Sequence, residues 1–166
     1  MDDRVEELIA AWRATMPDAL GLTSELAKRI MLLAADLDAA TRRELPALGL
    51  TPAEFDVLVA LRRSGKPYRL TPNALSRALL LSSGGTSNVV NRLVARGLVR
   101  RVSHPDDGRS TLIQLSADGK RLAETAVRAN TAAHEEVLAA VPPTVARAAT
   151  EALRQVFAAT DRPRRR

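Results

Sequence analysis

The sequence contains no cysteine among its 166 residues and no long hydrophobic run. Without cysteine, the chain cannot form disulfides, thiolate metal sites or a cysteine nucleophile. A membrane span needs ~18 consecutive apolar residues, and no stretch approaches that length. The N-terminal "MDDRVEELIA" is acidic and amphipathic, unlike the basic n-region and apolar core of a secretory signal. We therefore expect a cytoplasmic protein.

Residues suited to catalysis or metal binding are also scarce. Of the two histidines, His104 is expected to be a turn residue or a weak phosphate contact. The "HEEV" that contains His134 lacks the second histidine of a zinc-protease helix. No glycine-rich phosphate loop and no nucleophile triad can be identified. The sequence thus predicts that the protein is not an enzyme and has no cofactor and no metal site.

Aromatic residues make up only 2% of the chain, although hydrophobic residues make up 46%. The interior must therefore be filled by Leu, Val and Ala, which pack readily between helices. This composition favours a mainly α fold, and the length fits one domain with helical extensions.

The positive charge is concentrated in the middle of the chain. Residues 62–121 contain 12 Lys and Arg residues but only 3 Asp residues, whereas the remainder contains 13 basic and 16 acidic residues. Such segregation favours a polyanionic partner, of which nucleic acid is the commonest. The alternative is a solvated basic face that binds nothing.

Helices with apolar stripes are predicted at both ends of the chain, over residues 2–15, 22–45, 116–140 and 144–160. Apolar residues recur at steps of three and four along the last three of them. These residues are Leu22, Leu26, Ile30, Leu33, Leu37 and Ala40, then Leu122, Ala126, Ala129, Ala133, Val137 and Ala140, and finally Val145, Ala149, Leu153 and Val156. Because the basic middle of the chain cannot cover these stripes, we expect the flanking helices to form a homodimer. Packing of the same stripes within a monomer is the alternative.

Three short helices are predicted in the middle of the chain. Thr51, Pro52 and Glu54 form a capping box that begins the first. The Thr-Pro pair recurs at residues 71–72, where the second begins, and the third covers about residues 83–96. The inner face of this third helix is expected to contain Val90, Leu93 and Val94.

Two β-prone runs follow, "LVRRV" and "TLIQL", and the loop between them predicts a two-stranded hairpin. A helix, a short helix, a helix and a hairpin in this order define a winged helix-turn-helix. The predicted fold is therefore mainly α with a minor β part. Residues 49–115 are expected to form a winged helix-turn-helix DNA-binding lobe, and residues 1–48 and 116–166 to form dimerisation helices.

The third short helix is expected to enter the major groove of DNA, which admits one α-helix. Hydroxyl, amide and guanidinium groups, which bind bases and phosphates, lie off its buried face, and further arginines lie on the hairpin. The predicted DNA-binding residues are Ser83, Thr86, Ser87, Asn88, Asn91, Arg92, Arg101 and Arg109. The alternative is an ordinary polar helix surface.

The tip of the hairpin carries Arg109, which can reach into a narrow minor groove. Asp107 is placed to brace that guanidinium or the loop backbone, whereas Asp106 with Pro105 shapes the turn. The carboxylates of this loop are therefore predicted to support the wing and not to contact DNA.

The segment "DDGRSTLIQLSADG" resembles the wing signature of the multiple antibiotic resistance regulator (MarR) family, an Asp-x-Arg followed six residues later by Leu-Thr-x-x-Gly. The matching residues are Asp107, Arg109, Leu115, Ser116 and Gly119, with Ser in place of the usual Thr and still a good N-cap. "RLVARGLVRR" and "LTPAEFDVLVALRRSG" also lie at the family's expected places, so the resemblance covers roughly residues 22–160. It implies a homodimer built from the N- and C-terminal helices and operator binding by the third helix and wing. It also implies derepression when a small aromatic or anionic molecule binds between the dimer helices and the lobe.

The first helix with Trp12, the "EFDVL" that contains Asp56 and the stretch "LSSGGTSN" are similar to the urate-responsive branch of this family. In that branch a tryptophan, an aspartate and an arginine of the recognition helix form the sensing site, which implies Trp12 and Asp56 as effector-binding residues. Arg101 falls where that branch has a basic residue after the helix. Val89 departs from the pattern, because the branch usually has arginine there, and an anionic ligand would lose that cation. The alternatives are that Trp12 packs the first helix and that Asp56 is a surface carboxylate near a helix N-terminus.

Together these features predict a dimeric, sequence-specific regulator of transcription that binds double-stranded DNA, a repressor released from a pseudo-palindromic operator by a small molecule. Two other classes stay open, a winged helix used as a protein-interaction module and a ligand-independent architectural DNA-binding protein. Salt distinguishes the first of these, because counterion release makes DNA binding steeply salt-dependent.

Overall fold

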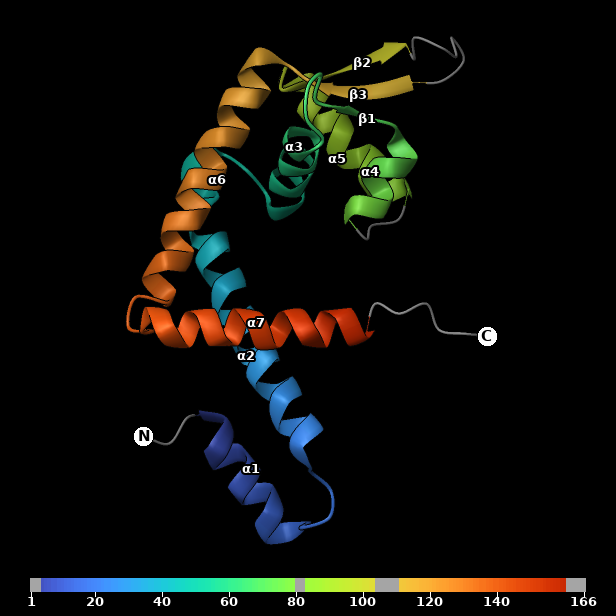
Figure 1. Ribbon diagram of the computed structural model, residues 1–166. Helices are drawn as coiled ribbons and strands as arrows, with labels where there is room; N and C mark the ends of the chain where they lie inside the picture. Colours follow the sequence, from blue (N-terminus) through green and yellow to red (C-terminus); the bar gives the residue numbers. More distant parts are fainter. Residues whose placement is uncertain (1–3, 80–82, 104–110, 161–166) are drawn as a thin grey trace.

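The computed structural model describes residues 4–79, 83–103 and 111–160. The elements are, in order, α1 (Arg4–Thr15), α2 (Leu22–Glu44), a 3₁₀ turn (Pro46–Leu48), α3 (Pro52–Arg63), β1 (Arg69–Leu70), α4 (Pro72–Leu79), α5 (Ser83–Ala95), β2 (Val99–Ser103), β3 (Thr111–Leu115), α6 (Ala117–Val137) and α7 (Pro143–Thr160). In Figure 1, α3, α4, α5 and the strands form a lobe at one end, α1 lies at the other, and α6 runs from the lobe toward α7. The mainly α fold with a winged helix-turn-helix lobe is confirmed.

The helices of the lobe begin where their capping residues predict. At α3, the Thr51 hydroxyl accepts a hydrogen bond from the Glu54 backbone N–H at 3.3 Å, and Thr51 N–H donates to Glu54 Oε2 at 2.9 Å. This exchange is the predicted capping box. At α4, the Thr71 hydroxyl accepts from Ala74 N–H at 3.1 Å. Local sequence therefore determines where these two helices start.

The wing belongs to a three-stranded antiparallel sheet of order β1-β3-β2. The predicted hairpin of β2 and β3 is confirmed, with Arg101 opposite Ile113. The sequence did not predict β1, whose Arg69 and Leu70 pair with β3 as well. Two residues are too short a run to carry a strand pattern, and their pairing depends on the position of β3. The loop of residues 104–110, which contains Asp107 and Arg109, lies outside the described residues.

The core lies inside the lobe, between α3, α5 and the sheet. Its fully buried large side chains include Leu58, Leu61, Leu93 and Ile113. The predicted inner face of α5 is correct for Leu93 and Val90 but wrong for Val94, which is 37% exposed. Val89 is buried in its place. The buried face of α5 is therefore rotated toward Val89, which belongs to the core of the lobe.

The start of α6 is joined closely to the wing. Ser116 caps the helix by accepting from Gly119 N–H at 2.9 Å, and its hydroxyl donates to the Leu98 carbonyl at 3.1 Å. A Cβ at Gly119 would lie 1.9 Å from the Leu98 carbonyl oxygen, so only glycine allows this approach. At the other end of α6, His134 Nε2 lies 2.9 Å from the Thr41 hydroxyl of α2. One helix thus connects the wing to the flanking helices.

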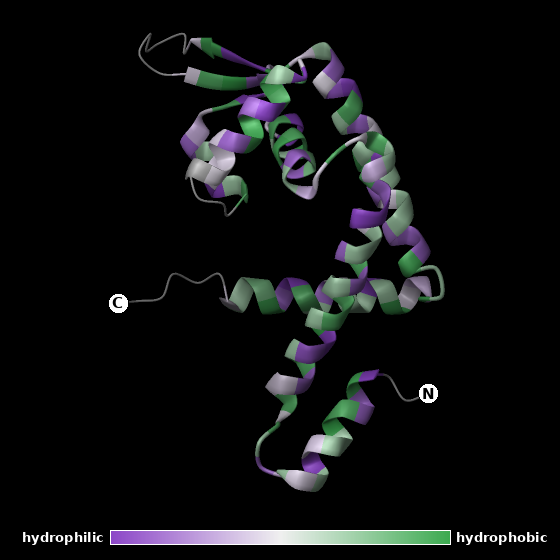
Figure 2. Cartoon of the chain, turned by 180° about the vertical axis from the view of Figure 1, so that it is seen from behind, coloured by the Kyte–Doolittle hydropathy of each residue, from purple (hydrophilic) through white to green (hydrophobic). Residues whose placement is uncertain are grey.

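The flanking helices α1, α2 and α7 bury few residues. Val5 and Ile9 of α1 are buried, and ion pairs join α1 to the first half of α2, among them Arg29 with Glu6 at 3.2 Å. Within the described residues, none of α7 is buried and only Ala40 of α2 is. Figure 2 shows hydrophobic residues repeating along these helices. Among the described helices, none is both long and apolar enough to cross a membrane.

Candidate nucleic-acid interface

The outer face of α5 is polar and exposed. Burial of Val89, Val90 and Leu93 fixes the rotation of the helix, so the residues on the opposite side face solvent. The predicted DNA-binding residues on this side are Ser87, Asn88, Asn91 and Arg92, all of which are exposed. Their amide, hydroxyl and guanidinium groups suit base edges and phosphates.

Arg101 of β2 adjoins this face. Its guanidinium donates to Asn91 Oδ1 at 2.7 Å, so the wing and α5 present two of the predicted residues together. Arg101 and Ser87 also line a small hollow of about 70 Å³ between α4, α5 and the sheet, to which Asn73 and Ser76 contribute. Asn73 was missed by the sequence analysis because α4 carries no basic or amide cluster that would have marked it.

Of the remaining predicted DNA-binding residues, Thr86 does not add to this face. Thr86 is 2% exposed, and its hydroxyl accepts from Ser76 at 3.0 Å, so it joins α4 to α5. The prediction that Thr86 binds DNA is corrected accordingly, since a buried hydroxyl does not reach a base or phosphate. Ser83 begins α5. Arg109 and its predicted brace Asp107 lie outside the described residues.

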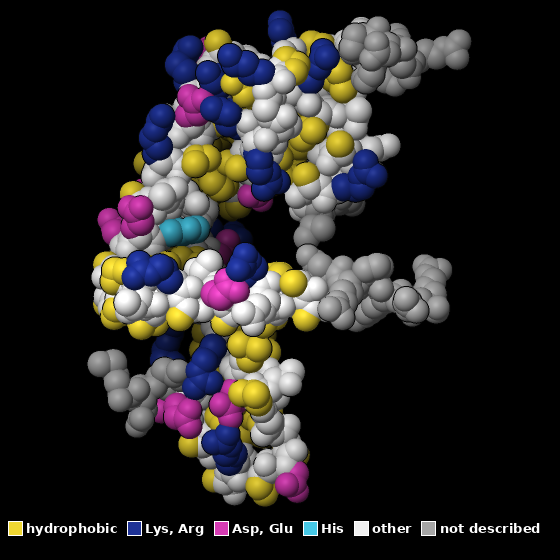
Figure 3. All heavy atoms as spheres, viewed as in Figure 1, with side chains coloured by type: hydrophobic (Ala, Val, Ile, Leu, Met, Phe, Trp, Pro, Cys, Tyr) yellow, Lys and Arg dark blue, Asp and Glu magenta, His cyan; other side chains and the backbone are white. Residues whose placement is uncertain are grey.

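Basic side chains surround this polar face. Figure 3 shows Lys and Arg gathered over the lobe, with the acidic residues more frequent on the flanking helices. Arg100 of β2 is exposed and donates to Gln114 Oε1 at 3.2 Å, whereas Arg101 points to α5. Successive residues of a strand point to opposite faces of the sheet, so the side chains of Arg100 and Arg101 lie on different faces. The predicted segregation of charge therefore corresponds to a surface that suits a polyanion.

A buried carboxylate contacts the flank of α5. Glu54 Oε1 lies 3.5 Å from Arg92 Nε and 3.4 Å from Arg96 Nη1. Burial raises the pKa of Glu54, but the Thr51 hydrogen bonds and the charges of Arg96 and Arg92 outweigh it, so this pKa lies below its ordinary value. The sequence marked Glu54 only as a capping residue, because its contact with α5 is tertiary.

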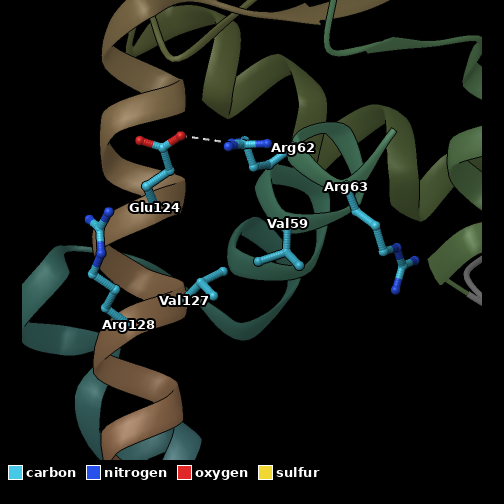
Figure 4. Close-up of a pocket in the computed structure, with 6 residues that line it drawn as sticks. All are labelled: Val59, Arg62, Arg63, Glu124, Val127 and Arg128. Carbon is cyan, nitrogen blue, oxygen red and sulfur yellow. Dashed lines mark hydrogen bonds and ion pairs between the residues drawn. The ribbon is translucent and has the colours of Figure 1, made fainter. Parts of the chain in front are cut away.

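A second concave site lies between α3 of the lobe and α6. Its volume is about 480 Å³, within the range of small-molecule pockets, and it is lined by Val59, Arg62, Arg63, Glu124, Val127 and Arg128. In Figure 4 the two valines face each other across the opening, and Arg62 of α3 donates to Glu124 of α6 at 2.8 Å. The Arg62 hydrogen bond lowers the pKa of Glu124, desolvation opposes it, and the charges of Lys120, Arg62 and Arg128 lower it further. The site combines apolar walls with cations.

The two residues predicted to bind an effector, Trp12 and Asp56, lie far apart in the folded protomer. Trp12 is exposed on α1, whose neighbouring Arg13 pairs with Glu25 near the start of α2. Asp56 of α3 instead interacts with Asp38, 13 residues further along α2, which corresponds to about 20 Å of helix. Burial, then repulsion from Asp38, raises the pKa of Asp56, with Arg42 opposing. One protomer does not bring Trp12 and Asp56 together.

Comparison with known sequences agrees with this geometry. Residues 48–110 match the sequence pattern of the MarR family. The chain is 29% identical over 141 residues to the HTH-type transcriptional regulator PecS of Dickeya dadantii (strain 3937), which covers 81% of each chain. It is also 31% identical over 108 residues to an HTH-type transcriptional regulator of Mycobacterium leprae (strain TN), covering 65% of this chain and 71% of that one.

Solved structures share the fold. A mutant of MarR from E. coli, complexed with operator DNA, superposes with a TM-score of 0.67 at 23% identity, covering 88% of this chain and 97% of that one. An organohalide-sensing transcriptional regulator in its 2,4-dichlorophenol-bound form has a TM-score of 0.69 at 20% identity and covers 88% and 85%. The polar face of α5, the adjoining wing and these likenesses lead to one conclusion. The chain belongs to the MarR family of winged-helix, DNA-binding transcriptional regulators, which are not enzymes.

Proposed function

We propose that this regulator binds a pseudo-palindromic operator as a homodimer and represses transcription until a small aromatic or anionic molecule releases it. The observation that carries the proposal is the exposed face of α5, to which Arg101 of the wing is hydrogen-bonded through Asn91. In this arrangement α5 lies in the major groove while the wing contacts the adjoining backbone. The E. coli MarR mutant that was solved with operator DNA has the same fold. DNA binding supports a cytoplasmic location for the protein.

Uncovered apolar residues on the flanking helices support the homodimer. Leu22 of α2 is 81% exposed and Phe157 of α7 is 62% exposed. Figure 3 shows hydrophobic side chains along α7 and on neighbouring parts of the flank. Apolar patches of this kind mark association surfaces, and a two-fold dimer is the commonest solution. In this proposal residues 1–48 and 116–166 form the dimerisation part and residues 49–115 the DNA-binding lobe.

The pocket between α3 and α6 supports a small effector. Val59 and Val127 offer contact to an apolar ring, and Arg62 offers a guanidinium to an anionic group. The structural relative bound to 2,4-dichlorophenol responds to a molecule of this size and character. An anion that binds Arg62 competes with Glu124, and thereby alters the contact between the lobe and α6.

The layout with α1, Trp12 and Asp56 resembles that of the urate-responsive branch, but we propose a different effector for this chain. Val89 supplies no cation, and its side chain is buried in the core of the lobe. Asp56 has Arg42 and Asp38 as its charged neighbours. We therefore propose that the pocket at Arg62, and not a urate site at Trp12 and Asp56, receives the effector.

Fluorescence anisotropy with the intergenic DNA beside the regulator's own gene tests the proposal. Scrambled DNA of equal length is the control, at two salt concentrations, with and without urate, salicylate and related aromatic acids. We expect selective binding that one compound reverses. Equal, purely salt-driven binding to both DNAs would indicate an architectural protein, and a shallow salt dependence would indicate a protein-interaction module.

The effector pocket is tested separately with Arg62→Ala. The guanidinium of Arg62 faces Glu124 in the pocket, so its removal is expected to weaken release by the active compound about tenfold and to leave operator affinity nearly unchanged. Arg121→Ala, an exposed arginine on α6 paired with Asp118, is the matched control. Equal responses of the two variants to the compound would place the effector elsewhere.

A further inference from the structure

The two carboxylate oxygens of Glu54 have different partners. Oε2 accepts from the backbone N–H and the hydroxyl of Thr51, which caps α3. Oε1 faces Arg92 and Arg96. The residue is 4% exposed, so this charge lies under the surface of the lobe and not on it. Capping requires only an acceptor at this position, and glutamine meets that need equally well. The charge of Glu54 therefore needs another explanation.

Arg92 lies near the end of α5, and Arg96 directly follows the helix, four residues further on. Arg92 follows Asn88 by four residues, so its side chain adjoins the outer polar face of the helix. It meets Glu54 through Nε, and a phosphate oxygen would therefore approach the two terminal nitrogens of the guanidinium. Both arginines are more than one third exposed, although the carboxylate between them is buried. Glu54 therefore contacts one edge of each guanidinium, and the rest of each guanidinium is exposed to solvent.

Such a contact affects selectivity more than affinity. An unrestrained arginine on a helix adopts many rotamers and finds a phosphate on any DNA. A guanidinium held by a buried carboxylate is presented in one arrangement, which suits only a backbone that passes at the matching place. The negative charge also reduces the attraction of the lobe for DNA in general.

We propose that Glu54 is a positioning residue that determines how strongly this regulator prefers its operator, because it holds Arg92 and Arg96 against α3. The proposal rests on operator binding by α5 as set out above. Glu54 touches no DNA in this role and acts through the two arginines.

Glu54→Gln tests this role, because glutamine keeps the capping box and removes the charge. We expect affinity for scrambled DNA to rise about threefold to tenfold and the preference for the operator to fall by a similar factor. The slope of log K against log salt on scrambled DNA should steepen by about 0.9 for each phosphate newly contacted. Glu7→Gln on exposed α1 makes the same change of net charge far from α5, and it should leave the preference unchanged.

A double-mutant cycle shows whether the effect passes through Arg92. In an Arg92→Gln background, Glu54→Gln should change the preference by less than half as much as it does alone. Equal effects in both backgrounds, or parallel losses of affinity for operator and scrambled DNA, would overturn the proposal. If the wild type itself has no preference, operator binding fails instead, so the two failures are distinguishable.

Arg92→Lys keeps the proposal testable if Glu54→Gln does not fold. Lysine retains the charge but cannot present one nitrogen to Glu54 and two others to a phosphate. The expected result is unchanged affinity for scrambled DNA with a reduced preference for the operator. A variant with wild-type preference would contradict the proposed role.

Discussion

The lobe and the flanking helices differ in how far one chain can bury their apolar residues. α3 in the lobe buries six of its 12 residues, whereas none of the 18 residues of α7 is buried. Both helices carry apolar residues at helical spacing. The difference lies in what surrounds them, since α3 packs against α4, α5, α6 and the sheet. One chain buries the apolar residues of α3, whereas the proposed homodimer would cover those of α7.

The largest effect is expected for a cavity in the lobe. Leu58→Ala removes a fully buried side chain of α3 and should lower the free energy of unfolding by about 2–5 kcal/mol. Urea denaturation measures this loss. Leu22→Ala on exposed α2 is the control, with an expected change of less than about 0.5 kcal/mol in a protomer at low concentration. Similar losses at both positions would mean that the flank is packed as tightly as the lobe.

The next effect is expected on association. Replacing Leu26 of α2 and Phe157 of α7 by Asp places charges on the exposed apolar surface of the flank and should weaken the dimer by more than about 100-fold. Sedimentation equilibrium measures this change, and circular dichroism should show an intact lobe. A wild-type protein that is monomeric at micromolar concentration would refute the interpretation of the flank.

A smaller effect is expected at the DNA surface of the lobe. Arg101→Ala removes the guanidinium that is bonded to Asn91 and should cost about 1–3 kcal/mol of operator affinity. Arg100→Ala on the same strand, bonded to Gln114, should cost less and affect operator and scrambled DNA alike. Anisotropy titrations compare the two. If both substitutions lowered the affinity for operator and scrambled DNA equally, both arginines would contact phosphates only.

The smallest effect concerns Asp56, where the lobe meets α2. Its pKa is raised in the folded state by burial and by Asp38, so ionised Asp56 opposes folding. Stability from this group is therefore greatest below the unfolded pKa of about 3.9 and declines as pH rises through the folded value. Asp56→Asn should raise the melting temperature slightly at pH 7, with the gain vanishing near pH 3. A lower melting temperature at pH 7 would indicate a favourable ion pair with Arg42.

Local signals in the sequence predicted the lobe well. The capping box at Thr51 and the N-cap at Ser116 each depend on a residue three positions away, and the hairpin depends on two β-prone runs that are neighbours in the sequence. Val94 was placed inward incorrectly because Val89, Val90, Leu93 and Val94 permit two rotations of α5, and only packing against neighbouring elements decides between them. β1 was missed for a related reason, since its pairing with β3 is tertiary.

The candidate site was predicted in part. Asn88, Asn91 and Arg101 could be identified because helix rotation and strand alternation expose them. Thr86 could not be separated from these residues by sequence, because its partner Ser76 lies on another helix. The second role of Glu54 and the pocket between Arg62 and Glu124 likewise depend on contacts between elements. Such contacts leave no local pattern.

The glycine joint at the start of α6 has a geometrical consequence for a two-fold dimer. Because Gly119 lies directly against the Leu98 carbonyl, we expect the root of the wing to follow the 21-residue helix, which is about 31 Å long. A tilt of about five degrees at the flank would displace the wing by about 3 Å, close to one base-pair step on a duplex whose half-sites recur every ~34 Å. In the proposed dimer, a modest change where α6 meets the flank would therefore shift the two lobes relative to the two halves of an operator.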